Sequence, residues 1–256
     1  MTSSAPKRAR GKGANRIEGG YLRSITLLRD QVPSFDSYPF SIPAVRGLNT
    51  LPLHPQVTFF IGENGTGKST LLEAIAIKAG FNAEGGSKNF NFATRNSESD
   101  LSQTVRLTRG PVREQDGWFL RAESLYNVAT EIDRLGVQGY GPTSMHEQSH
   151  GESFMALANH RFRGRGLYFL DEPEAALSPS RQLAFLKIIA EHVTNRASQF
   201  IIATHSPIIL AYPLATIYLF TGEGIAPTTY EETEHFKVTS DFLVHREAYL
   251  HHLLLE

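Results

Sequence analysis

A glycine-rich segment, GENGTGKST at residues 62–70, narrows the possible folds of this chain more than any other stretch. The apolar run at residues 57–61 comes directly before it and predicts a buried strand, and a helix is predicted from about residue 68 to 78. The glycines of the segment permit positive φ angles, so successive backbone N–H groups can face one anion. This order of strand, glycine-rich turn and helix predicts an α/β fold with a phosphate-binding loop.

The predicted loop supplies groups for a nucleotide and for its metal ion. Lys68 is expected to reach the β- and γ-phosphates as a point charge, and the Ser69 hydroxyl is expected to ligate Mg²⁺. The positive end of the following helix adds to the attraction for phosphate. The residues expected to contact the nucleotide form one contiguous set: Gly62, Glu63, Asn64, Gly65, Thr66, Gly67, Lys68, Ser69 and Thr70.

Length and composition restrict the class of protein. A chain of 256 residues with 41% hydrophobic residues can bury a substantial core. The net charge of −1 does not indicate a globally basic nucleic-acid surface, although a local patch can exist within a balanced total. The absence of cysteine excludes disulfides, thiol catalysis and cysteine-ligated zinc. No apolar run reaches the ~18 residues that span a bilayer, and the first residues do not resemble a secretory signal, so we expect a cytoplasmic protein without membrane insertion.

The chain divides into a tail and one domain. Residues 1–18 are small, polar and basic, and we expect a disordered tail, with a nucleic-acid-binding arm as the alternative. Residues 19–256 are expected to form a single domain, within which residues 82–163 form a helical and variable lobe. A first strand is predicted at residues 21–28, and the prolines of residues 29–55 favour a loop-rich edge sheet.

Apolar patterning predicts the remaining elements. Strands are predicted at residues 103–109, 117–123, 166–172 and 199–206, and helices at 125–135, 152–162 and 179–193. The inward face of the last helix is expected to carry Leu183, Leu186, Ala190 and Val193. Alternation of strands and helices implies a mainly parallel sheet.

Two of these strands deliver polar residues to the carboxyl edge of the sheet, where ligands bind in open α/β folds. Asp171 and Glu172 follow four apolar residues, which matches a Walker B strand; Asp171 is expected to hold Mg²⁺, and Glu172 to deprotonate the attacking water. The alternative for this pair is an exposed acidic turn. His205 ends the next strand and is expected to bind the γ-phosphate and the water, with a buried core histidine as the alternative.

The motifs together resemble the ATP-binding-cassette (ABC) superfamily, and specifically its soluble ATPase heads. The matching segments, in the family's order, are GENGTGKST at 62–70, SHGES at 149–153, YFLDEPEAALSP at 168–179 and ATHS at 203–206. SHGES resembles the signature motif, with Ser149, Gly151 and Glu152 retained and His150 in place of a glycine. The resemblance extends over most of residues 20–222.

The resemblance implies a P-loop NTPase with a mainly parallel central sheet, an N-terminal antiparallel edge sheet and a small helical lobe that carries the signature motif. It also implies ATP and Mg²⁺ as ligands, and a head-to-tail homodimer in which the signature of one subunit faces the nucleotide of the other. The helix after Ser149 could offer its amides to that phosphate. In the alternative, Ser149 only caps its own helix and Glu152 completes a capping box.

The chain departs from the family pattern at further places. FLRAES lies where the Q-loop glutamine is expected, so Arg121 and Glu123 are the candidate replacements. Tyr38 and Phe40 are the candidates for stacking on adenine, with a core role as the alternative for both. The segment AALSP resembles soluble ATPases of chromosome maintenance and phage defence, although the stretch between the Walker motifs is too short for long coiled-coil arms.

Three functions are compatible with these motifs. The first is an ATPase whose dimerisation couples nucleotide state to a partner protein or nucleic acid, in DNA repair or phage defence. The second is a transporter's nucleotide-binding subunit, which the missing Q-loop glutamine disfavours. The third is a non-catalytic, ATP-gated interaction module, which Glu172 disfavours. Residues 240–256 predict a helix that closes the core of the domain or, in the alternative, binds a partner.

Overall fold

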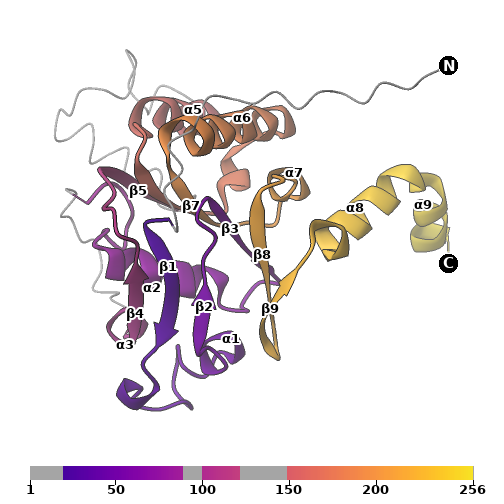
Figure 1. The fold of residues 1–256 in the computed structure, drawn as a ribbon. Coiled ribbons are helices and arrows are strands. Elements are labelled where there is room, and N and C mark those ends of the chain that lie inside the picture. Colours follow the sequence, from indigo (N-terminus) through magenta and orange to yellow (C-terminus); the bar gives the residue numbers. More distant parts are fainter. Residues whose placement is uncertain (1–19, 89–99, 122–148, 256) are drawn as a thin grey trace, which may run out of the picture.

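The computed structural model of the protein describes residues 20–88, 100–121 and 149–255 (Figure 1). The predicted tail at residues 1–18, the predicted helix at 125–135 and Glu123 lie outside the described residues.

A six-stranded, mostly parallel sheet forms the centre of the molecule, as predicted. Its strands, in spatial order, are β5 (Asp116–Arg121), β6 (Gly166–Asp171), β7 (Gln199–Ala203), β3 (Val57–Gly62), β8 (Ala215–Thr221) and β9 (Gly224–Thr228). Only the pairing of β8 with β9 is antiparallel. Strands β3, β6 and β7 are buried at every position, which explains their continuous apolar runs.

A second, antiparallel sheet has the order β2-β1-β4, with β1 at Leu22–Leu27, β2 at Thr50–Pro52 and β4 at Val105–Arg109. One buried side chain links the two sheets. Gln199, at the start of β7, accepts hydrogen bonds from the N–H groups of Tyr21 and Leu22, each at 2.9 Å. Its amide nitrogen donates to the carbonyl oxygens of Leu22 at 2.8 Å and His54 at 2.9 Å. The predicted antiparallel edge sheet is therefore joined to the central sheet by a fully bonded glutamine.

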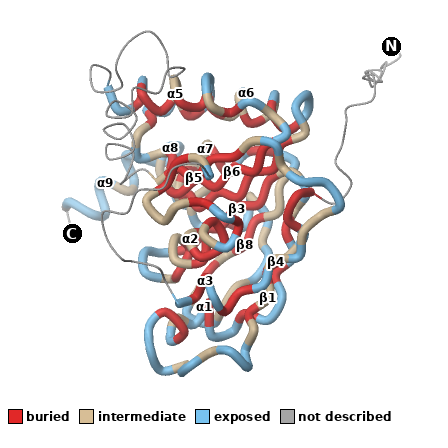
Figure 2. The backbone as a smooth tube through the Cα atoms, turned by 90° about the vertical axis from the view of Figure 1, so that its left-hand side faces the viewer, coloured by how far each residue is buried: buried red, intermediate tan, exposed pale blue. Residues whose placement is uncertain are grey.

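Helices cover both faces of the central sheet (Figure 2). On one face lie α2 (Lys68–Ala79) and α1 (Pro43–Arg46), together with the antiparallel sheet and α3 (Leu101–Thr104). On the other lie α5 (His150–Arg161), α6 (Pro179–Arg196) and α7 (Pro207–Leu210). Three 3₁₀ helices complete the described connections: η1 (Arg29–Gln31), η3 (Pro173–Ala176) and η4 (Tyr230–Glu232). Successive strand residues point to opposite faces, so Phe59 packs under α5 and α6 whereas Phe60 packs under α2.

The inward face of α6 agrees with the predicted one at Val193, which is buried, and at Leu186 and Ala190, which pack against the core, but it differs at Leu183. Leu183 is 60% exposed, while the buried positions of the helix are Gln182, Phe185, Ile189, His192 and Val193. Gln182 can be buried because both its amide oxygen and its amide nitrogen form hydrogen bonds. It accepts from the Ser206 hydroxyl at 2.5 Å and donates to the Leu177 carbonyl oxygen at 3.0 Å. An apolar-spacing argument misses such a residue, since burial here depends on partners that are distant in the sequence.

The range 82–163 contains strands of both sheets. Strand β4 pairs with β1, and β5 pairs with β6, so both belong to the body of the fold. A helical lobe spanning the whole range stays a prediction, because residues 89–99 and 122–148 lie outside the described part of the chain.

The C-terminal stretch forms two helices, α8 (Glu234–Val244) and α9 (Arg246–Leu255), which extend away from the β9 side of the sheet (Figure 1). The prediction that this stretch closes the core is wrong. No residue of α8 is fully buried, and the two helices expose Val238, Leu243, Val244, Leu250, Leu253 and Leu254. The rings of Phe242 and Tyr249 pack against each other instead, with centroids 5.7 Å apart. None of the helices in the described residues is long and apolar enough to cross a membrane.

Candidate active site

The phosphate loop forms the turn between β3 and α2, as predicted. Gly62, Gly65 and Gly67 have φ angles of +140°, +81° and +97°. A Cβ atom on Gly62 would lie 2.3 Å from the carbonyl oxygen of Phe220. One on Gly67 would lie 2.8 Å from the side chain of Ile42. At these two positions, close packing requires glycine in addition to the backbone conformation.

The crest of the loop faces outward. Glu63, Asn64 and Gly65 are exposed, and Thr66 is half-buried. The Thr66 hydroxyl donates to the carbonyl oxygen of Glu63 at 2.8 Å, which closes the turn. The tip of the loop is therefore accessible to a ligand, while its ends are anchored in the core.

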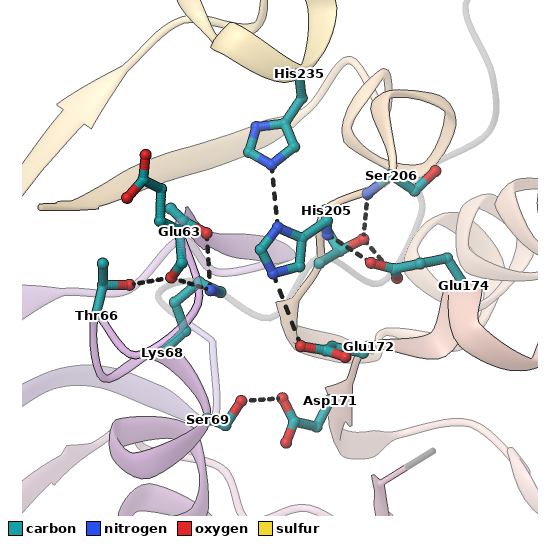
Figure 3. A network of polar contacts seen from close by, with 12 residues as sticks. Glu63, Thr66, Lys68, Ser69, Asp171, Glu172, Glu174, His205, Ser206 and His235 are labelled. Atoms are coloured by element: carbon teal, nitrogen blue, oxygen red, sulfur yellow. Dashed lines mark hydrogen bonds and ion pairs between the residues drawn. The ribbon is translucent and has the colours of Figure 1, made fainter. Parts of the chain in front are cut away.

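Lys68 is held at the base of the loop with only 3% of its surface exposed. Its ammonium group donates to the carbonyl oxygens of Gly62 and Glu63, both at 2.8 Å (Figure 3). Burial lowers the pKa of Lys68. The carboxylates of Glu172, Asp171 and Glu174 oppose this shift, and Glu172 has the largest effect of the three. A cation in this position is a strong attractor for phosphate, because burial leaves it little screened by solvent.

The two predicted magnesium ligands meet, although they come from different motifs. The Ser69 hydroxyl, at the start of α2, lies 2.8 Å from Oδ1 of Asp171, at the end of β6 (Figure 3). Asp171 is buried, with 7% of its surface exposed. A hydroxyl and a carboxylate are oxygen ligands of the kind that Mg²⁺ prefers, so these residues fit the predicted ion.

Glu172 and His205 also meet at this edge. Glu172 adopts a left-handed backbone conformation with φ +49° and ψ +53°, which is uncommon for a residue other than glycine. Its Oε1 atom lies 3.7 Å from Nε2 of His205, and its side chain is 41% exposed. Burial lowers the pKa of His205, and the Lys68 charge acts in the same direction, so the ring is neutral near pH 7.

Glu174 supports this histidine, and the sequence analysis did not single it out. Its carboxylate accepts a hydrogen bond from the His205 N–H at 2.5 Å and another from the Thr204 hydroxyl at 2.7 Å. Burial raises the pKa of Glu174, while the two donated hydrogen bonds act against the shift. The available signal was its position two residues after Glu172, in the segment DEPEA.

His235 is a second residue that the sequence analysis missed. It lies on α8, and its Nε2 atom is 3.2 Å from Nδ1 of His205 (Figure 3). A cavity of about 610 Å³ opens between α8 and the phosphate loop, and its lining includes Gly62, Glu63, Thr66, His205, His235 and Val238. No motif marks His235, because the contact joins a lone histidine to one 30 residues earlier.

Models of two protein families match adjoining segments of the chain. Residues 35–125 match a model described as "AAA domain", and residues 127–211 match one described as "AAA domain, putative AbiEii toxin, Type IV TA system". The thiamine import ATP-binding protein ThiQ of Cereibacter sphaeroides is 29% identical over 164 residues, which cover 57% of this chain and 69% of that protein. ThiQ of Ruegeria sp. is 30% identical over 165 residues, which cover 57% of this chain and 69% of that protein. The chain belongs to the ABC/AAA-type P-loop ATPases.

A solved structure agrees with this assignment at the level of the fold. It is described as "An inward-facing conformation of a putative metal-chelate type ABC transporter" and aligns with a TM-score of 0.51 at 16% identity. The alignment covers 88% of the present ATPase and 89% of that chain.

The segment that resembles the signature motif lies apart from the phosphate loop of the same chain. Ser149 is the N-cap of α5 and forms a reciprocal capping box with Glu152. The Ser149 N–H donates to Glu152 Oε2 at 2.9 Å, and the Glu152 N–H donates to Ser149 Oγ at 3.4 Å. Arg181 of α6 forms an ion pair with Glu152 at 3.3 Å. A Cβ atom on Gly151 would lie 2.4 Å from the Arg181 guanidinium. Helix α5 covers the face of the central sheet opposite α2, so the two motifs do not converge within one chain.

Arg121 occupies the end of β5, beside the Walker B aspartate of β6. Its Nη1 atom lies 2.6 Å from Oε2 of Glu73 on α2, and its Nε atom lies 3.9 Å from Oδ2 of Asp171. Burial raises the pKa of Glu73, and the Arg121 charge opposes that shift. The guanidinium of Arg121, the predicted replacement for the Q-loop glutamine, is therefore paired with two carboxylates.

The two aromatic candidates for adenine stacking differ in accessibility. Phe40 is 1% exposed and belongs to the core under α2, so it offers no face to a ligand. Tyr38 is 72% exposed, and its hydroxyl lies 3.4 Å from Oγ1 of Thr70 in the first turn of α2. Of the pair, Tyr38 alone is accessible next to the phosphate loop.

Proposed function

We propose that this ATPase hydrolyses ATP to ADP and phosphate. The observation that carries the proposal is the convergence of Lys68, Ser69, Asp171, Glu172 and His205 at the carboxyl edge of the central sheet. Lys68 and the loop amides bind the β- and γ-phosphates, and Glu172 accepts the proton of the attacking water. His205 donates from Nε2 to the transferring phosphate. Ser69 and Asp171 would hold Mg²⁺, which neutralises phosphate charge when bound.

The proposal extends to a head-to-tail homodimer. Ser149 and the first turn of α5 lie on the face opposite α2, so they are available to the nucleotide of a second copy rather than to their own. The N-terminal amides of this 12-residue helix favour an anion. The capping box of Ser149 and Glu152 is compatible with this role, because it occupies only some of the free amides.

We further propose that Tyr38 stacks on the adenine base. Its ring is exposed, and Thr70, which its hydroxyl contacts, lies two residues after Lys68. Stacking of a base on an aromatic side chain contributes about 1–3 kcal/mol.

We propose that the nucleotide state of this ATPase is coupled to a partner protein or nucleic acid. The process in which it acts would be DNA repair or phage defence. The match of residues 127–211 to the toxin-associated AAA model favours this direction. A transporter subunit is the second candidate, and the ThiQ relatives favour it. The candidate replacement of the Q-loop glutamine by Arg121 argues against a transporter subunit, because the Q-loop of transporters contacts the membrane domains. In this chain Arg121 instead forms an ion pair with Glu73.

The test compares Mg²⁺-dependent ATP turnover and light-scattering mass for the wild type and Glu172→Gln, each with and without DNA. The proposal expects a fall in turnover of ~10²- to 10⁴-fold and an ATP-dependent dimer of the variant. Glu223→Gln is the matched control, because Glu223 is exposed in the β8–β9 turn. Equal turnover of Glu172→Gln and wild type, or no turnover in any condition, would overturn the hydrolytic role. A monomeric variant with ATP bound would overturn the dimer.

A further inference from the structure

Helix α8 contributes a side chain to the active site through a contact between two histidines. Nε2 of His235 lies 3.2 Å from Nδ1 of His205, and the ring centroids are 5.4 Å apart. The other nitrogen of His205, Nε2, faces Glu172 and has no hydrogen-bond partner within the described part of the chain. His205 is thus hydrogen-bonded on one nitrogen, while the other is buried beside Glu172 and makes no hydrogen bond within the described residues.

The proton positions of this pair are restricted by the groups around it. Burial lowers the pKa of both histidines, and the Lys68 charge acts in the same direction. The charge of Glu172 opposes this shift at His205, and those of Glu234 and Glu174 oppose it at His235, but each pKa stays below its ordinary value, so both rings are neutral near pH 7. A neutral imidazole carries one N–H, so in a bonded pair one ring donates and the other accepts. Two arrangements are then possible: either His205 Nδ1 donates to His235, or His235 Nε2 donates to His205.

The ligands proposed for His205 select between these arrangements. A phosphate oxygen and the Glu172 carboxylate are both acceptors, so His205 must carry its proton on Nε2 to bind either of them. Its Nδ1 atom is then an acceptor and needs a donor. His235 Nε2–H is the donor that the structure provides at this distance.

Helix α8 is held where it can make this contact. Thr233, at the helix N-cap, is 2% exposed, and its hydroxyl accepts from the Phe236 N–H at 3.3 Å. The Phe236 ring packs on Tyr230 with centroids 4.8 Å apart, and the Tyr230 hydroxyl donates to the Pro207 carbonyl oxygen at 3.0 Å. Pro207 begins α7, two residues after His205. The first turn of α8 is therefore attached to the same segment that carries His205.

We propose that His235 is a positioning residue that donates to His205 Nδ1 and so holds the tautomer in which Nε2–H binds the transferring phosphate. The inference rests on the proposed hydrolytic function and deepens it, because it makes α8 a part of the active site. Displacement of α8 would then lower turnover without removing any residue that contacts the nucleotide phosphates.

The test compares steady-state ATP turnover of the wild type, His205→Ala, His235→Ala and His235→Gln, with Lys237→Ala as a control at an exposed position of α8. His235→Ala is expected to lower kcat by about 10- to 100-fold, the range for residues that orient metal-bound histidines, with KM changed less than about threefold. His235→Gln retains a side-chain N–H donor and is expected to recover most of the loss. Unchanged kcat in His235→Ala, beside an inactive His205→Ala, would overturn the proposal.

A second measurement separates this inference from the proposed hydrolysis. Nitrogen chemical shifts of ¹⁵N-labelled histidine report the tautomer directly, and comparison with His235→Ala assigns the signals. The expected result is a proton on Nε2 of His205 in the wild type, with a loss of this preference in His235→Ala and its return in His235→Gln. A proton on Nδ1 of His205 in the wild type would overturn the inference, whether or not the protein hydrolyses ATP.

Discussion

Strands β3, β6 and β7 are buried at every position, whereas α8 has no fully buried residue and, with α9, exposes several large apolar side chains. Both regions nonetheless supply side chains to one site. The sheet edge holds Lys68, Ser69 and Asp171 through dense packing, while α8 reaches His205 through a few contacts. The phosphate-binding half of the site therefore rests on fully buried strands, whereas the histidine half also depends on a helix that is anchored at its first turn and exposed beyond it.

Truncating one phenylalanine in each region tests the comparison most directly and has the largest expected effect. Phe169 of β6 is fully buried and makes edge contacts with Phe81 and Phe119. We expect Phe169→Ala to lower the free energy of unfolding by about 3–5 kcal/mol in urea titrations, because it leaves a core cavity. Phe242→Ala in α8 is the matched variant and is expected to cost about 1 kcal/mol or less. Equal losses for the two variants would contradict the comparison.

The next largest effect is expected on ATP affinity when the buried ammonium group of Lys68 is removed. Lys68→Ala is expected to weaken ATP binding by about 10- to 100-fold in titration calorimetry, since a hydrogen bond to a charged group contributes about 1.5–3 kcal/mol. Lys78→Ala serves as the control, because Lys78 is exposed at the far end of the same helix, where its ammonium donates to the carbonyl oxygen of Gln103 at 3.4 Å. Loss of affinity in both variants would indicate disruption of α2 rather than loss of a phosphate contact.

A buried histidine that packs against the central sheet is expected to make stability depend on pH. His192 of α6 packs edge-on against Phe162, Tyr168 and Phe200, and burial lowers its pKa to about 4. The unfolded chain takes up this proton near pH 6.5 and the folded protein only near pH 4, so stability is full above pH 6.5 and falls below it. We expect a loss of about 1–2 kcal/mol between pH 7 and pH 5 from this group in urea titrations. His192→Leu should lose less over this interval, and an equal loss would contradict the assignment to His192.

The smallest effect is expected at the tip of the C-terminal helices. Leu253 is 67% exposed on α9, so Leu253→Ala should change the free energy of unfolding by less than about 0.5 kcal/mol. Thermal unfolding and ATP turnover measured on the same preparation check this expectation. A loss of more than about 1 kcal/mol would mean that α9 packs on the domain in solution.

Much of the site could be predicted from the sequence because its motifs are local. The glycines at 62, 65 and 67, the buried strand before Asp171 and the one before His205 each follow from a few adjacent residues. The meeting of Ser69 with Asp171 follows in turn, since carboxyl ends of parallel strands share one edge. The prediction of an inward Leu183 on α6 and that of a core-closing stretch at residues 240–256 failed, because apolar spacing alone cannot tell an inward leucine from an exposed one.

The central strands, the phosphate loop and the order of the motifs follow from local sequence, since they depend on short-range periodicity and on backbone conformations that particular residues permit. The accessibility of Tyr38 and burial of Phe40, the inward position of Gln182 and the contact of His235 with His205 follow from the folded chain alone. These outcomes depend on hydrogen bonds and packing between segments that are distant in the chain. No local pattern encodes such contacts, because burial and pairing are set by whichever element the rest of the fold brings alongside.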